Sequence, residues 1–218
     1  ILANLDSPWD LALAADATLF FTEKCRGLSV RTPDGAVRHL FGASGAAVAA
    51  DDLFCQGQSG MLGLALDPAF ADNRMLYLFM ASKLGGQPAN RVVRLQVDAA
   101  STTVRDRTDI VTDIPFKQSF NRWGRAGAHS GGRLRFSPKD GFLYVTTGDN
   151  HNGPLPQDLT RLGGKVLRID RDGRPAPGNT TPSGGDARIF TYGHRNVQGL
   201  AFRQVTGQPF ACEHGPGH

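Results

Sequence analysis

The chain has 218 residues, of which 40% are hydrophobic, and this is enough to fill the core of one large globular domain or two small ones. The formal net charge is +4 and no run of Lys or Arg is longer than two, so we exclude nucleic acid as a partner. No stretch approaches the roughly 18 consecutive apolar residues of a membrane span, so we also exclude a transmembrane segment.

The first half of the chain contains two units of similar design. Residues 7–27 are predicted to form two strands joined by a turn, and residues 28–41 add two more strands around a Pro-Asp-Gly turn. A second hairpin follows in residues 59–83, and its additional pair of strands is predicted in residues 91–111. Each unit therefore has a small or polar start, an alternating apolar strand and a returning strand.

The second half repeats the design. Residues 130–150 are predicted to form the third hairpin, and further strands are predicted in residues 165–178, which contain an Arg-Asp-Gly turn, and in residues 187–193. A fourth hairpin follows in residues 196–215. No segment shows a sustained apolar period of 3.6 residues, so we expect no substantial helix.

Four antiparallel strands per unit, recurring roughly every 50–70 residues, are the pattern of a β-propeller. The alternative is a β-sandwich whose hairpins resemble one another by accident. Because the fourth unit stops after its second strand, we expect one all-β domain over residues 1–218 that is incomplete at its C-terminus, in a chain trimmed or processed before Ile1. The expected blades are about 7–55, 56–125, 126–195 and a partial blade 196–218.

In a propeller the first strand of each blade lines the central channel, so the residues that precede first strands and follow second strands meet at one rim. The residues expected at this rim are Trp9, Gln58, His129, Arg195, Asn196 and Gln198 before first strands, and Asp149, Asn150, Glu213 and His214 after second strands. Glycine and serine neighbours allow a flat ligand to approach the backbone. We therefore expect the ligand site at this rim.

Simpler roles are expected for several polar residues. Asp149 and Asn150 are expected to cap their loop by accepting hydrogen bonds from backbone amides, and Trp9 is expected to pack inside the channel. The residues expected at the surface are His39 and His151, and those expected to be structural are Asp158 and Lys165.

Three cysteines cannot all pair within one chain, and none has a metal-binding spacing. Cys25 ends a returning strand and Cys55 precedes the next first strand, so a disulfide between adjacent blades is geometrically possible. Two free buried thiols are the alternative. A disulfide would indicate an oxidising compartment.

Five motifs carry a resemblance to a known family. They are GQSGMLGLALDPAF (57–70), AHSGGRL (128–134), GKVLRID (164–170), GHRNVQGLAF (193–202) and EHGP (213–216). In this order they resemble the soluble quinoprotein sugar dehydrogenases, the glucose/sorbosone dehydrogenase family that uses pyrroloquinoline quinone (PQQ). The family is a six-bladed propeller, so the resemblance implies that this chain is its first three and a half blades.

The resemblance implies roles for individual residues. His129 matches the general base that takes a proton from the anomeric hydroxyl while hydride passes to PQQ, and imidazole is the side chain suited to that task near neutral pH. Arg195 and Asn196 match residues that hold the cofactor, and an arginine beside the quinone would also stabilise the negative charge that arrives with hydride.

The remaining matches concern substrate and metal. Gln58 matches a substrate-side residue, and Gly215 and Pro216 match positions whose carbonyls bind Ca²⁺, a hard cation that prefers oxygen. The residue before the base is a carboxylate in the soluble glucose dehydrogenases, whereas here it is Ala128. The resemblance therefore favours the aldose dehydrogenase branch.

We expect a periplasmic or secreted enzyme that oxidises aldose sugars to lactones with PQQ and Ca²⁺ and passes the electrons to an external acceptor. The alternatives are a calcium-dependent lactonase, which would need several carboxylates facing the channel, and a binding-only propeller without redox activity. Because the family's later PQQ-binding basic residues fall beyond His218, we expect the 218 residues alone to bind PQQ weakly or not at all.

Overall fold

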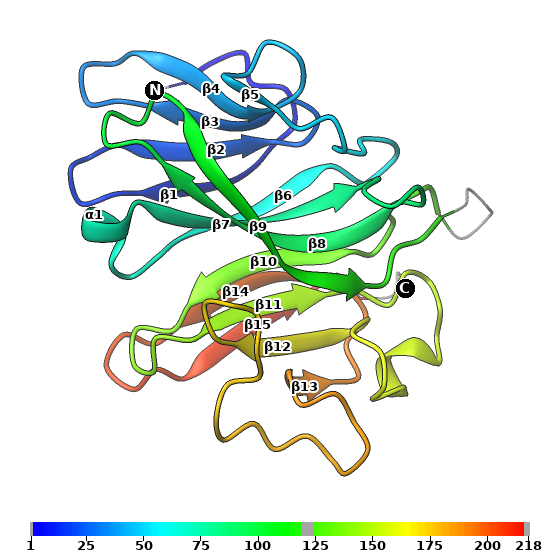
Figure 1. Ribbon diagram of the computed structural model, residues 1–218. Helices are drawn as coiled ribbons and strands as arrows, with labels where there is room; N and C mark the ends of the chain where they lie inside the picture. The colour runs from blue at the N-terminus through cyan, green and yellow to red at the C-terminus, as the bar shows by residue number, and fades with distance from the viewer. Residues whose placement is uncertain (1, 119–123, 216–218) are drawn as a thin grey trace.

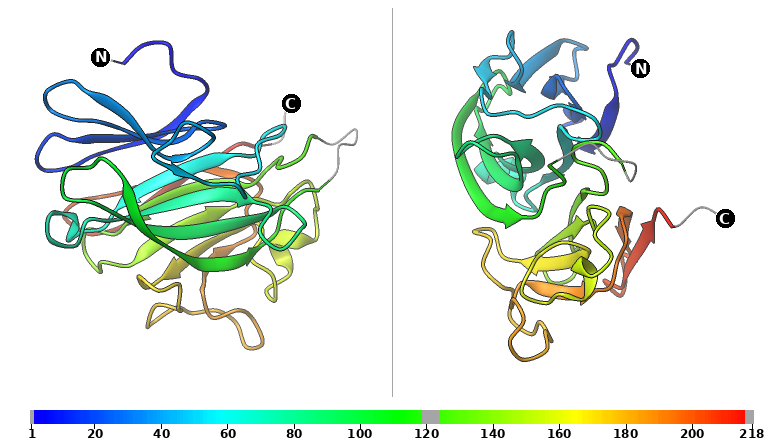
Figure 2. Two further views of the ribbon diagram at one scale, coloured as in Figure 1. Left: turned by 45° about the horizontal axis from the view of Figure 1, so that its top comes forward. Right: turned by 90° about the vertical axis from the view of Figure 1, so that its right-hand side faces the viewer.

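The computed structural model describes residues 2–118 and 124–215. Within these residues the strands form four sheets, which follow one another along an arc from the N-terminal sheet to the C-terminal pair of strands (Figure 1 and the right-hand view of Figure 2). The strands of each sheet stand in chain order, each beside the next. This arrangement is that of a β-propeller, so the all-β prediction is confirmed and the sandwich alternative is wrong.

The first sheet contains β1 (Pro8–Leu13), β2 (Leu19–Glu23), β3 (Gly27–Arg31), β4 (Val37–Gly42) and β5 (Val48–Ala49). The first four strands are antiparallel, and the two-residue β5 runs parallel to β4. The predicted Pro-Asp-Gly turn joins β3 to β4, where Gly35 adopts a φ of +93° and its amide donates to the Thr32 carbonyl at 2.9 Å.

The second sheet contains β6 (Met61–Leu66), β7 (Met75–Ser82), β8 (Ala89–Val97) and β9 (Val104–Ile114). The turn between β6 and β7 holds the short α1 helix, Phe70–Asn73. Together with the 3-10 turn η1 (Leu155–Gln157), this is the helical content of the described residues, in agreement with the expectation of no substantial helix.

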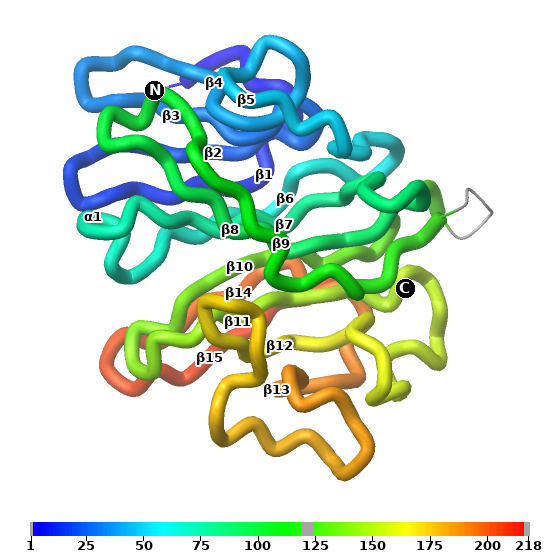
Figure 3. Tube along the Cα trace, in the orientation of Figure 1, coloured from blue at the N-terminus to red at the C-terminus, as the bar shows by residue number. Residues whose placement is uncertain are grey.

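The third sheet contains β10 (Gly131–Phe136), β11 (Leu143–Thr147), β12 (Lys165–Ile169) and β13 (Ile189–Tyr192), and a fourth sheet pairs β14 (Val197–Phe202) with β15 (Pro209–Glu213). The long connection from β12 to β13 extends away from the sheets, as the trace in Figure 3 shows. No helix in the described part of the chain has the length and apolar character needed to cross a membrane.

The apolar cores lie between neighbouring sheets, and β7 shows why. Its side chains alternate, so that Leu76, Leu78 and Met80 belong to the core shared with the first sheet, while Tyr77 and Phe79 face the core shared with the third sheet. All five are fully buried. A strand buried on both faces has a continuous apolar sequence, which explains the run MLYLFMA.

The first strands of the sheets lie side by side at the centre, with β6 against β1 and β10, and β10 against β14. The buried carboxylate of Asp10 on β1 holds three of them together. It accepts hydrogen bonds from the Leu64 amide at 3.0 Å and from Arg135 at 2.9 and 3.0 Å. The segments that precede these strands are thereby brought to one rim.

Candidate active site

A polar pocket of about 300 Å³ lies at the rim where the segments before the first strands meet. Its lining consists of Trp9, Lys24, Gly57, Gln58, Leu62, Gly127, His129, Ser130, Gly131, Asn196 and Gln198. The structure therefore brings together five of the six residues expected before first strands. The sixth, Arg195, lies next to the pocket residue Asn196.

A histidine–carboxylate pair stands at this pocket. His129, which is 5% exposed, places Nδ1 2.7 Å from Oδ1 of Asp149, the second residue after β11. Gly148 makes the approach possible, because a Cβ at that position would lie 1.9 Å from the His129 carbonyl oxygen. The two residues are thus held together by the close approach of the segments before β10 and after β11.

The protonation states of the pair follow from its contacts. Burial opposes ionisation of Asp149, but hydrogen bonds from His129 and from the His151 amide outweigh it and hold the pKa of Asp149 below its ordinary value. At neutral pH the carboxylate is therefore ionised and can only accept hydrogen bonds, so Nδ1 of His129 is the donor. In the neutral imidazole the lone pair then lies on Nε2, where it can receive a proton.

His151 was expected at the surface; it is partly exposed, but it also reaches the site. Its ring stacks on His129 with 3.6 Å between ring centroids. The physical reason is the backbone: Asn150 and His151 have φ values of +52° and +55°, so the chain turns back immediately after Asp149. Burial, together with the neighbouring His129, lowers the pKa of His151.

Asp149 does cap its loop as expected, because its Oδ1 accepts a hydrogen bond from the His151 amide at 2.8 Å. Its pairing with His129 was not foreseen, since the two residues are 20 positions apart. Lys165, expected to be structural, is fully buried, and its ammonium donates to the carbonyls of Leu155, Pro156 and Gly163 at 2.6–3.0 Å.

Asn196 also lines the pocket and is fixed by two hydrogen bonds. Its Oδ1 accepts from the Gly131 amide at 3.0 Å and from the side-chain amide of Gln198 at 2.8 Å. The carboxylate of Glu213 in turn accepts from the backbone amides of Arg195 and Asn196, at 2.7 and 3.3 Å. This segment is therefore positioned by β14 and β15 together.

The guanidinium of Arg195 donates to the carbonyls of His214 and Gly215, at 2.6 and 3.0 Å. The Gly215 carbonyl was expected to bind Ca²⁺, but here it accepts from a cation, and Pro216 lies outside the described residues. Across the described ranges no group of three or more His, Cys, Asp or Glu side chains is placed to hold a metal.

Trp9 both packs and lines the pocket. It contacts the core between the second and third sheets, and the Arg133 guanidinium stacks over its ring, 4.1 Å from the centroid. The described lining residues include one lysine and no carboxylate. The pocket is therefore suited to a ligand that carries negative charge.

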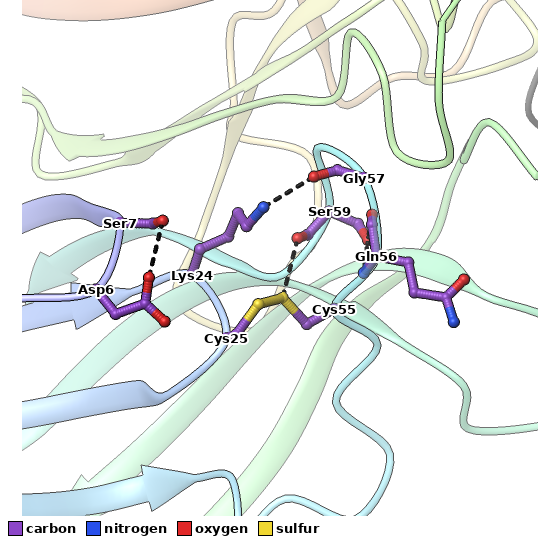
Figure 4. Close-up of a disulfide and its surroundings, with 8 residues drawn as sticks. All are labelled: Asp6, Ser7, Lys24, Cys25, Cys55, Gln56, Gly57 and Ser59. Carbon is purple, nitrogen blue, oxygen red and sulfur yellow. Dashed lines mark hydrogen bonds between the residues drawn. A yellow bond between two sulfur atoms is a disulfide. The ribbon is translucent and has the colours of Figure 1, made fainter.

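Cys25 and Cys55 form a disulfide, so the question left open by the sequence is resolved in favour of a covalent link between neighbouring sheets (Figure 4). Cys212 is a free and exposed thiol on β15. The disulfide lies beside Lys24, Gly57 and the pocket (Figure 4).

The fold and the pocket define a β-propeller whose channel mouth carries a buried histidine–carboxylate pair among amide and hydroxyl side chains. A family described as "Glucose / Sorbosone dehydrogenase" matches residues 5–218. The chain belongs to this family.

Individual relatives agree with this assignment. Aldose sugar dehydrogenase YliI of Escherichia coli is 31% identical over 98% of this chain and 55% of its own length. Quinoprotein glucose dehydrogenase B of Acinetobacter calcoaceticus is 30% identical over 99% of this chain and 48% of its own length. Among solved structures, the PQQ-bound form of aldose sugar dehydrogenase from Streptomyces coelicolor has a TM-score of 0.81 at 31% identity, over 98% of this chain and 58% of that one. The chain thus spans about half the length of the curated relatives it matches.

Proposed function

We propose that the protein carrying this chain is a PQQ-dependent aldose dehydrogenase that oxidises the sugar to a lactone, with His129 as the general base. The observation that carries the proposal is the buried His129–Asp149 pair at the polar pocket. Family membership and the PQQ-bound relative support the choice of cofactor.

The geometry gives each residue of the pair a task. With Nδ1 hydrogen-bonded to Asp149, the Nε2 atom of His129 is the acceptor for the proton of the anomeric hydroxyl. The imidazolium that results is stabilised by the ionised carboxylate 2.7 Å away. When bound, PQQ would supply the acceptor for the hydride that leaves the anomeric carbon of the sugar.

The other pocket residues would hold the ligands. Gln58 would bind a sugar hydroxyl, because it lies in the same pocket as His129. Asn196 and Arg195 would contact the cofactor, and a described lining without a carboxylate suits the carboxylates of PQQ. The donor types therefore fit PQQ.

Calcium binding by the carbonyls of Gly215 and Pro216 stays a prediction of the family resemblance. Because the Gly215 carbonyl accepts a hydrogen bond from Arg195, no step of the proposed mechanism passes through a metal. A periplasmic or secreted location is proposed from the Cys25–Cys55 disulfide, since such bonds persist in oxidising compartments. Electron transfer to an external acceptor is likewise part of the proposal.

The test is reconstitution of the full-length protein with PQQ, with and without Ca²⁺, followed by aldose oxidation with an artificial electron acceptor. The proposal expects PQQ-dependent reduction of the acceptor and formation of the lactone. Sugar binding without turnover would favour the binding-only alternative. Lactone hydrolysis without PQQ would favour a lactonase, although no carboxylate lines the described pocket.

A further inference from the structure

The 56–60 turn, which carries Gln58 into the pocket, is seated against the segment that leads to His129. The Gln58 amide donates to the Ala126 carbonyl at 3.0 Å. Gly57 has a φ of +62°, and a Cβ on it would lie 2.6 Å from the same carbonyl oxygen. The turn therefore lies directly on its neighbour, and any shift of the turn moves Gln58 relative to the base.

Inside the turn, Ser59 closes the backbone. Its hydroxyl accepts from the Gln56 amide at 3.1 Å and donates to the Gln56 carbonyl at 2.6 Å. Ser59 is buried, whereas Gln56, Gly57 and Gln58 are exposed. The exposed part of the turn depends on contacts with other segments for its position.

Lys24, the residue after β2, supplies one of those contacts from the first sheet and also holds the strand that follows the turn. Its ammonium donates to the Gly57 carbonyl at 2.8 Å (Figure 4). Its own carbonyl accepts from the Met61 amide at 2.8 Å. Within the described residues no carboxylate lies within 4.0 Å of this ammonium. The charge of Lys24 is thus directed to the turn and to the pocket that it lines.

The disulfide is a second tie between the same two segments. Cys25 follows Lys24, and Cys55 precedes the turn, with its Sγ 3.5 Å from the Ser59 carbonyl. Figure 4 shows the sulfur bridge and the Lys24 hydrogen bond reaching the turn side by side. One tie is covalent and the other is charge-assisted.

We propose that Lys24 and the Cys25–Cys55 disulfide are positioning groups that jointly hold the 56–60 turn, and that they set the affinity of the pocket for sugar through Gln58. The identity of the ligand rests on the proposed function. Neither group contacts the His129–Asp149 pair, which is held by the close approach of Gly148 to His129 at the end of the β10–β11 pair. Loosening the turn should therefore weaken sugar binding and leave the proton-transfer step nearly intact.

The first readout needs no activity. Amide hydrogen exchange is measured in the full-length protein for the wild type, Lys24→Met, Lys24→Arg and the Cys25→Ser/Cys55→Ser double variant, with Lys139→Met and Cys212→Ser as matched controls. The amides of Gln58 and Ser59 should exchange about tenfold faster in Lys24→Met and in the double variant, because each variant removes one tie and makes local opening of the turn easier. The β11 amides should be unchanged in the Lys24 variants and in the two controls, and the far-UV circular dichroism spectrum of the double variant should match that of wild type, which shows that the fold is retained.

The second readout is steady-state kinetics with PQQ and an aldose, together with calorimetric titration of the sugar. Lys24→Met and the double variant should raise KM and the sugar dissociation constant about tenfold, with kcat within about twofold of wild type. Lys24→Arg, which keeps a cationic donor, should restore the affinity to within about threefold.

Three outcomes separate the claims. Unchanged exchange at Gln58 and Ser59 overturns the positioning role, whatever the activity is. Faster exchange without a change in sugar affinity overturns the link to the ligand. A wild-type protein that binds PQQ but oxidises no aldose refutes the proposed function, while the exchange data still decide whether Lys24 and the disulfide hold the turn.

Discussion

Removal of the Cys25–Cys55 disulfide should lower the free energy of unfolding by an amount that follows from its place in the chain. The two cysteines are 30 residues apart. In the chain-entropy description, opening a loop of this length returns about 12 cal/mol/K to the unfolded state, or about 3.6 kcal/mol at 25 °C. With a urea dependence of about 2–3 kcal/mol/M, the midpoint of unfolding should fall by more than about 1 M.

The assay is urea denaturation followed by circular dichroism, on the wild type, the Cys25→Ser/Cys55→Ser variant and the wild type after reduction. Cys212→Ser is the matched control, because Cys212 is a free and exposed thiol, and it should change the free energy by less than about 0.5 kcal/mol. The reasoning is refuted if the double variant unfolds at the wild-type midpoint, or if the control is destabilised as much as the double variant.

Two further predictions concern the buried charged groups. Asp149→Asn should lower kcat by about 10²-fold or more, because the amide cannot stabilise the imidazolium of His129. Stopped-flow measurement of turnover tests this effect. A kcat within threefold of wild type would show that the carboxylate only caps its loop. Burial lowers the pKa of Lys165 to about 8, against 10.5 in the unfolded chain. Between pH 8 and pH 10.5 the unfolded chain therefore binds more protons than the folded chain, and the free energy of unfolding should rise with pH. In urea unfolding, the free energy of unfolding of wild type should therefore increase relative to that of Lys165→Met between pH 7.5 and pH 10. The same difference in free energy at both pH values would contradict the assigned pKa shift.

The fold was predictable because its signals are local. Each hairpin is marked by an alternating apolar strand and a turn of Asp, Pro or Gly, as at the Pro-Asp-Gly turn between β3 and β4. Once the units repeat, the propeller geometry places Gln58, His129 and Asn196 at one rim, and they do line one pocket. The proximity of Cys25 to Cys55 followed from the same geometry.

The details of the site were not predictable, because they depend on backbone conformations that residue types do not reveal. Asn150 and His151 are ordinary L-residues with positive φ, and this turn is what stacks His151 on His129. The partner of His129 lies on the neighbouring segment after β11. The Arg195 guanidinium donates to two backbone carbonyls, which no side-chain motif encodes.

The central claim is that His129 accepts the proton of the sugar. The most direct test compares His129→Gln with wild type in the PQQ-reconstituted full-length protein, with PQQ and sugar affinities measured alongside turnover. We predict a kcat lower by about 10²- to 10⁴-fold, with both affinities close to wild type, as expected for loss of a general base. Turnover at the wild-type rate in a variant that binds PQQ and sugar normally would contradict the account.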